Sequence, residues 1–242
     1  MCDVRKSAGR WVMMGLAAGL AAGAVATAKG QVGASTTIHT TRQESHARRE
    51  TNASRQARIQ RTIDATYSHR WEIFGGGGYL RFRSGQYTKR NNEVSWATQA
   101  DYYLNPRLAI IGDARGSFGY AHAILNNQYG VYNPQINEYT FMGGASYRFY
   151  RKEKLAISAQ GLGGVGWGIF SGGAKGLTGS TVGLWPDGFK PAFSAGVSAD
   201  YNFFPNLAVR FTPTYVGTTF GGKVQNNLGF NAGVVYRFGH QE

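Results

Sequence analysis

The sequence predicts an all-β fold: an eight-stranded antiparallel transmembrane β-barrel, preceded by a signal peptide and a disordered basic linker. Three observations predict it. Apolar side chains alternate with small or polar ones over segments of about ten residues, which suits tilted membrane-crossing strands better than the shorter strands of soluble sheets. The gaps between these segments alternate in length. The pattern F-x-x-G-x-x-Y-R-F occurs twice, at residues 141–149 and 230–238.

Residues 1–28 have the layout of a secretory signal peptide, with cleavage expected after Ala28. Three basic residues begin it: Arg5, Lys6 and Arg10. A membrane-anchoring helix is the alternative, but the apolar stretch covers only residues 11–26, and a spanning helix needs about 20 residues. Cys2 is the only cysteine and leaves with this peptide, so the mature chain is expected to fold without disulfides.

Residues 29–69 are predicted to be a disordered periplasmic linker, because they contain too few large apolar side chains to form a core. Within this linker, a short helix near Ala57–Ala65 is the alternative to disorder. The linker carries seven Lys or Arg residues against three acidic ones, within a chain of net charge +13. Its densest basic stretch, 42–61, contains no aromatic residue to stack on bases, so a solvated tether, or contact with anionic polymers or lipid head groups, is expected rather than nucleic-acid binding.

The barrel domain is predicted to cover residues 70–242. Its strands are expected at 71–83, 92–104, 107–118, 138–150, 154–168, 190–203, 206–217 and 226–238. Short gaps follow the second, fourth and sixth strands, and long gaps rich in Gly and Asn follow the others. Short turns on one side and long loops on the other are typical of outer-membrane barrels, and closure leaves no sheet edge unpaired in lipid.

A second repeat supports two similar halves. Asp101-Tyr102, followed by P-x-L-A at 106–109, returns as Asp200-Tyr201, followed by P-x-L-A at 205–208. The aromatic residues of both repeats are expected to face lipid at one membrane interface as a girdle. This predicted girdle consists of Tyr102, Tyr147, Phe149, Tyr201, Phe203, Tyr236 and Phe238.

The opposite faces of the same strands carry charges of both signs. The residues expected inside are Gln99, Asp101, Asp113, Arg115, Arg148, Asp200, Arg210 and Arg237. An eight-stranded barrel has an interior that side chains just fill, so these charges are expected to form an ionic network that plugs the lumen. A narrow gated channel for small solutes is the alternative.

No enzyme, cofactor or metal site is predicted. H-x-x-x-H, C-x-x-C and G-x-S-x-G are absent, and the run Gly75–Gly78 lacks the lysine of a phosphate-binding loop. Asp113, Ser117 and His122 could be combined into a triad on paper, but no spacing rule supports it. Glycines in strands more often mark curvature or close packing.

At this level of detail the sequence resembles the small outer-membrane β-barrel proteins, the OmpA/OmpX-like superfamily. The resemblance covers residues 70–242 and depends on the signal peptide, the alternating strands, Tyr147-Arg148-Phe149 and Val235–Phe238, and the two A-D-Y hairpins. Two departures exist. Gly239–Glu242 follows the last aromatic residue, where family members usually end on an aromatic read by the assembly machinery. No peptidoglycan-binding domain is expected, because nothing after the barrel in this sequence resembles one.

The resemblance implies a monomer in the cell outer membrane, in contact with membrane lipid, lipopolysaccharide and the outer-membrane assembly machinery. A structural or interaction role is expected, in envelope integrity or adhesion, with an external ligand at the loops. Tyr and Trp are common contact anchors, and the loop candidates are Tyr120, Asn126, Asn127, Tyr129, Tyr132, Trp185 and Lys190. Loop packing is the alternative for these residues, and a soluble lipocalin-like ligand-binding barrel is a further alternative for the whole chain.

Overall fold

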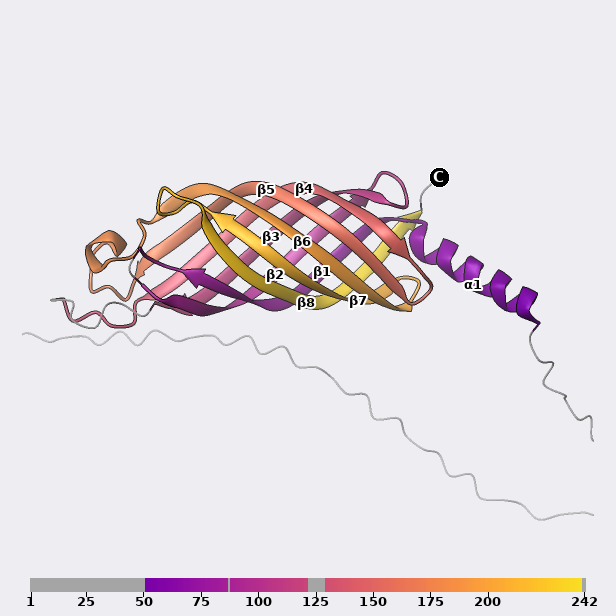
Figure 1. Ribbon diagram of the computed structural model, residues 1–242, viewed down its shortest axis with the longest axis horizontal. Coiled ribbons are helices and arrows are strands. Elements are labelled where there is room, and N and C mark those ends of the chain that lie inside the picture. Colours follow the sequence, from indigo (N-terminus) through magenta and orange to yellow (C-terminus); the bar gives the residue numbers. More distant parts are fainter. Residues whose placement is uncertain (1–50, 87, 122–128, 241–242) are drawn as a thin grey trace, which may run out of the picture. The chain divides into compact units, whose positions relative to one another are not determined.

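The computed structural model describes residues 51–86, 88–121 and 129–240, and they form one helix followed by a closed barrel (Figure 1). Helix α1 spans Asn52–Tyr67. The strands are β1 (His69–Arg83), β2 (Arg90–Tyr103), β3 (Leu108–Tyr120), β4 (Gln135–Arg151), β5 (Leu155–Gly172), β6 (Gly188–Phe204), β7 (Leu207–Thr218) and β8 (Gln225–His240). A short 3₁₀ helix, η1 (Gly179–Val182), lies between β5 and β6.

Each strand pairs antiparallel with its neighbours in the chain, and β1 pairs with β8 to close the barrel. This confirms the predicted all-β, eight-stranded antiparallel architecture, with strand ends within a few residues of those expected. The short connections 104–107, 152–154 and 205–206 lie at one end, here called the turn end. The longer connections after β1, β3, β5 and β7 lie at the other, here called the loop end. The predicted signal peptide lies outside the described residues.

Helix α1 corrects the expectation of a disordered linker over residues 52–67. It is longer than the short helix considered near Ala57–Ala65, and the Thr51 side chain caps it by accepting a hydrogen bond from the Ser54 amide. The composition of this segment gives little sign of a helix, because its side chains are mostly polar and exposed. Only its last residues, Thr66 and Tyr67, are buried. Among the described parts of the chain, no helix is both long and apolar enough to cross a membrane.

The two faces of the sheet differ in chemistry. The outward face carries large apolar side chains around the whole barrel, such as Ile73, Ile110, Val165, Val197 and Val234, each with about half its surface exposed. The inward face is mostly polar, with buried charged, amide and hydroxyl side chains. A soluble barrel would bury its apolar face, so this alternation is reversed relative to a water-soluble protein.

Glycines permit the tight curvature of the wall. Gly144 on β4 and Gly164 on β5 lie on adjacent strands, and a Cβ atom on either would meet a backbone carbonyl of the other strand, at Gly161 and Phe141 respectively. A side chain at these positions would therefore force the strands apart. This agrees with the reading of strand glycines as sites of close packing rather than as a phosphate loop.

Candidate functional site: the lumen and the loop-end surface

Glu72 is the centre of an ion-pair network inside the turn end. Its Oε1 accepts from Arg148 at 2.6 Å and from Arg237 at 2.8 Å, and its Oε2 accepts from Arg210 at 2.8 Å. The Tyr103 hydroxyl also donates to Oε2, at 3.2 Å. One carboxylate therefore joins side chains from β1, β2, β4, β7 and β8.

Arg210 connects this centre to two aspartates. Its Nε lies 2.7 Å from Asp200 Oδ1 and its Nη1 lies 3.0 Å from Asp101 Oδ2. Arg237 reaches Asp200 as well, at 3.3 Å. Three acidic and three basic side chains thus form one network with no net charge, which is the condition under which buried ions are tolerated.

The two sequence repeats converge on this network. The arginines of both Tyr-Arg-Phe triplets, Arg148 and Arg237, bind the same oxygen of Glu72. The aspartates of both A-D-Y repeats, Asp101 and Asp200, bind the same guanidinium of Arg210. Each half of the barrel, β1–β4 and β5–β8, therefore supplies one arginine and one aspartate from these repeats to the network.

Tyr67, at the end of α1, covers the network at the turn end. It is 3% exposed, its hydroxyl donates to the Lys152 carbonyl at 2.8 Å, and it accepts from Asn202 at 3.1 Å. The Arg148 guanidinium lies 5.0 Å from the Tyr67 ring centroid and 4.4 Å from the Tyr103 ring centroid. Arg148 Nη2 also donates a hydrogen bond to the Tyr103 hydroxyl. Burial raises the pKa of the Tyr67 phenol, so it remains a neutral donor.

A second polar layer lies further along the lumen. Arg115 pairs with Asp113 at 2.7 Å, separately from the Glu72 network. Gln99 donates to Asp101 of the Glu72 network at 2.6 Å and to Gln160 at 3.4 Å. Asp113 pairs with Arg115, and His122 lies outside the described residues, so the combination of Asp113, Ser117 and His122 stays untested.

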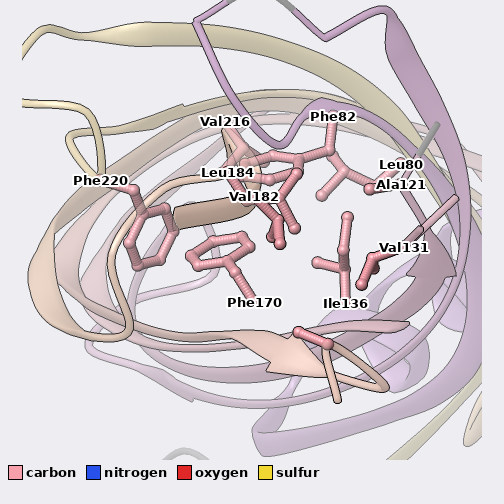
Figure 2. Packing of buried hydrophobic residues seen from close by; sticks show 11 residues of the cluster. Leu80, Phe82, Ala121, Val131, Ile136, Phe170, Val182, Leu184, Val216 and Phe220 are labelled. Atoms are coloured by element: carbon pink, nitrogen blue, oxygen red, sulfur yellow. The ribbon is translucent and has the colours of Figure 1, made fainter. Parts of the chain in front are cut away.

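An apolar cluster fills the loop end of the lumen (Figure 2). Phe82, Phe170 and Phe220 form its centre, with ring centroids 6.0, 6.2 and 5.2 Å apart. Around them pack strand residues and loop residues: Leu80, Ala121, Val131, Ile136, Ala174, Val182, Leu184 and Val216. Ala174, Val182, Leu184 and Phe220 belong to the connections after β5 and β7, so loop residues and strand residues pack together at this end of the barrel.

The predicted girdle lies on the outer surface near the turn end. Its exposed members are 38–55% exposed: Tyr147, Phe149, Tyr201, Phe203, Tyr236 and Phe238. Tyr102 is half-buried against Trp71, at 4.8 Å between ring centroids. Near the loop end, sequence reasoning missed a second aromatic band, in which neighbouring rings lie 5.6–5.7 Å apart through Phe118, Tyr139, Trp167 and Phe189.

The loop candidates do not form one cluster. Tyr120, Tyr129 and Tyr132 are exposed, whereas Trp185 packs against the apolar cluster and donates from Nε1 to the Arg83 carbonyl at 2.7 Å. Lys190 is half-buried on β6, and Asn126 and Asn127 lie outside the described residues. Trp185 borders a surface groove of about 320 Å³ that is also lined by Arg83, Gln86, Arg90, Lys223 and Gln225. The groove lining contains three basic residues and no acidic residue.

No protein-family model matches the sequence, and none of the curated proteins matches it. Solved structures do match. The outer membrane protein OprG of Pseudomonas aeruginosa aligns with 9% identity over 72% of this chain and 99% of its own, with a TM-score of 0.50. Neisserial surface protein A aligns with 15% identity over 69% and 97%, with a TM-score of 0.48. Ail of Yersinia pestis, in complex with the heparin analogue sucrose octasulfate, aligns with 17% identity over 69% and 97%, with a TM-score of 0.45. The match to OprG, together with the closed eight-stranded barrel, shows that the chain has the fold of a small outer-membrane barrel, as the sequence resemblance implies.

Proposed function

We propose that this chain is a closed outer-membrane barrel that acts through its surface, in envelope integrity or adhesion, and conducts no solutes. The supporting observation is that buried side chains pack inside the barrel near both of its ends. Six strands contribute side chains to the Glu72 network, with the Tyr103 hydroxyl included, at the turn end of the barrel. The apolar cluster occupies the loop end. A route for solutes would have to break buried ion pairs at one end and open packed loops at the other.

The outward face supports placement in a membrane. Aromatic bands border an apolar belt, and eight residue steps separate Tyr139 in one band from Tyr147 in the other. At about 3.3 Å per residue this is ~26 Å along the strand, which for a tilt of about 40° is about 20 Å along the barrel axis, comparable with the apolar band of about 25 Å that such barrels present. A soluble lipocalin-like barrel is less well supported, because it would hide these side chains from water and leave an apolar interior for a ligand.

In this placement α1 and the short turns face the periplasm, and the four loops face outward. Export through a cleaved signal peptide and insertion by the outer-membrane assembly machinery are part of the proposal. A monomer is expected, since every strand edge is paired within the chain. No catalytic, cofactor or metal-dependent activity is assigned to the proposed surface role.

The groove beside Trp185 supports a specific surface partner. Arg83, Arg90 and Lys223 are exposed, and all three line it at the loop end of the barrel. Phosphate groups of lipopolysaccharide lie at this level of an outer membrane, and clustered guanidinium and ammonium groups bind phosphate well. We therefore propose lipopolysaccharide phosphates as the ligand of this groove.

The placement is tested by expressing the full precursor in a Gram-negative host and fractionating the envelope. The outer-membrane fraction is compared unheated and boiled on a gel. A faster-migrating unheated band that shifts on boiling is the expected result, because a closed barrel resists detergent until heated. A soluble periplasmic band without a shift would overturn the proposal and favour the soluble ligand-binding barrel.

A further inference from the structure

Two buried carboxylates in the loop-end half of the lumen have no basic partner among the residues that the structure describes. Glu93 on β2 is 0% exposed and Glu138 on β4 is 2% exposed. None of their four carboxylate oxygens accepts a hydrogen bond. In the described part of the barrel, the other buried acids, Glu72, Asp101, Asp113 and Asp200, each contact an arginine.

The two carboxylates lie close to each other across β3. Glu138 is in register with Ser117, and Gly119 lies two residues further along β3, on the same inward face. The Glu93 side chain lies over Gly119, where a Cβ atom would approach Glu93 Cγ to 2.7 Å. The missing side chain at Gly119 thus lets Glu93 extend across β3 toward Glu138.

Charge counting isolates the same pair. Within the described residues, the buried side chains of the barrel include six acidic ones and four arginines, Arg115, Arg148, Arg210 and Arg237. The four arginines are matched by the four paired acids, so the excess of two negative charges belongs to Glu93 and Glu138. Burying two neighbouring carboxylates without a counter-charge is strongly unfavourable.

The surroundings supply further oxygen ligands. Glu138 borders a cavity of about 20 Å³, enough for one water-sized species, and Glu93 lies outside its lining. The polar lining residues are Ser95, Ser117, Thr140, Thr214, Asn231 and Arg115, and the others are Tyr79, Leu80 and Val216. Arg115 is engaged by Asp113. Asn91, two residues before Glu93 on the same inward face, has a buried side-chain oxygen with no partner. Carboxylate, hydroxyl and amide oxygens are the ligands that hard divalent cations prefer.

We propose that Glu93 and Glu138 form an internal site for one hard divalent cation, which neutralises both carboxylates and joins β2 to β4 inside the barrel. Calcium is the chosen probe because its coordination tolerates irregular oxygen geometry. The site is separate from the surface role proposed above and is independent of where the barrel resides.

The test refolds the full mature chain into detergent micelles with either EDTA or calcium chloride, because a site beneath packed loops is loaded during folding. After gel filtration, bound calcium and the urea midpoint are measured. The wild type is expected to retain about one calcium ion per chain and to have a higher midpoint than the EDTA sample. The E93Q/E138Q variant is expected to lose most of this calcium and to have the same midpoint in both media.

The control variant D64N removes an exposed carboxylate on α1 and is expected to retain calcium as the wild type does. Folding of each variant is checked by its heat-dependent gel shift. If the E93Q/E138Q variant fails to fold, the proposal is tested by the calcium content of the wild type and of the single variants E93Q and E138Q. A folded wild type that retains no calcium and whose midpoint does not respond to it would overturn the proposal. So would stabilisation of that metal-free protein by acid alone, since the pair would then bind protons.

Discussion

Glu72 and Arg237 are joined by a 2.8 Å ion pair directly across the seam where the first and last strands meet. The two residues are register partners on β1 and β8. Closing the barrel therefore brings together two charges that lie 165 positions apart in the chain. The same carboxylate binds Arg148 and Arg210, so formation of the seam also completes the network.

The first prediction concerns this centre. Replacing Glu72 with Ala leaves three buried arginines short of one counter-charge, and removal of one member of a buried ion pair typically costs about 3–5 kcal/mol. The urea midpoint of the variant in detergent micelles is expected to fall accordingly. The half-buried turn residue Glu153 provides the control, since E153Q leaves the network intact. An unchanged midpoint for E72A would show that the network contributes nothing to stability.

The second prediction concerns the loop-end cluster. Phe82 is fully buried against Phe170 and Phe220, and a Phe-to-Ala change in a packed core costs about 3–5 kcal/mol. F82A is therefore expected to lower the free energy of unfolding and to increase proteolysis of the loops. Y120A, at an exposed position, is the comparison and should have little effect. Equal proteolysis of both variants would contradict packing of the loops onto Phe82.

The third prediction concerns the contact between α1 and the barrel. Y67F removes the hydroxyl that binds Lys152 and Asn202 but keeps the ring beside Arg148. A loss of about 1 kcal/mol is expected for such hydrogen bonds, whereas Y67A should lose the cation–π contact in addition. Hydrogen exchange at the last turn of α1 should increase in the same order. Identical exchange in the three proteins would show that Tyr67 does not fix the helix end.

The fourth prediction concerns the basic groove. Replacing Arg83, Arg90 and Lys223 with Ala should weaken binding of the folded barrel to lipopolysaccharide in micelles. The difference should shrink as salt rises, because exposed charges are screened. The turn-end variant K152A/K154A removes exposed basic charge elsewhere and should bind as the wild type does. If dephosphorylated lipopolysaccharide binds the wild type equally well, phosphate recognition by the groove is wrong.

Strand positions were predictable from the sequence because period-two alternation and the length of each gap are local signals. The same alternation placed Asp101, Arg148, Asp200 and Arg237 on the inward face, where the structure has them. It could equally have placed Glu72, Glu93 and Glu138 inside. On β1 the alternation is weak, because Phe74 is a large apolar residue on the inward face and four glycines follow it, so Glu72 gives no clear signal. Glu93 and Glu138 lie near strand ends, where the alternation is also weak.

The loop-end cluster and the groove could not be predicted in this way. Val182, Leu184 and Phe220 lie in irregular segments, where no repeat period indicates which side chains turn inward. Trp185 illustrates the difficulty, since an aromatic residue in a loop fits both surface recognition and packing. The structure shows it packed on one side and bordering the groove on the other.

Single-channel recording in planar bilayers tests the sealed lumen most directly. The refolded wild type is expected to give no steady openings, while a general porin inserted in the same bilayer provides the positive control for recording. Steady wild-type openings whose conductance changes in R115A would contradict the account. They would establish that ions pass Arg115 and that the barrel is the narrow channel considered as its alternative.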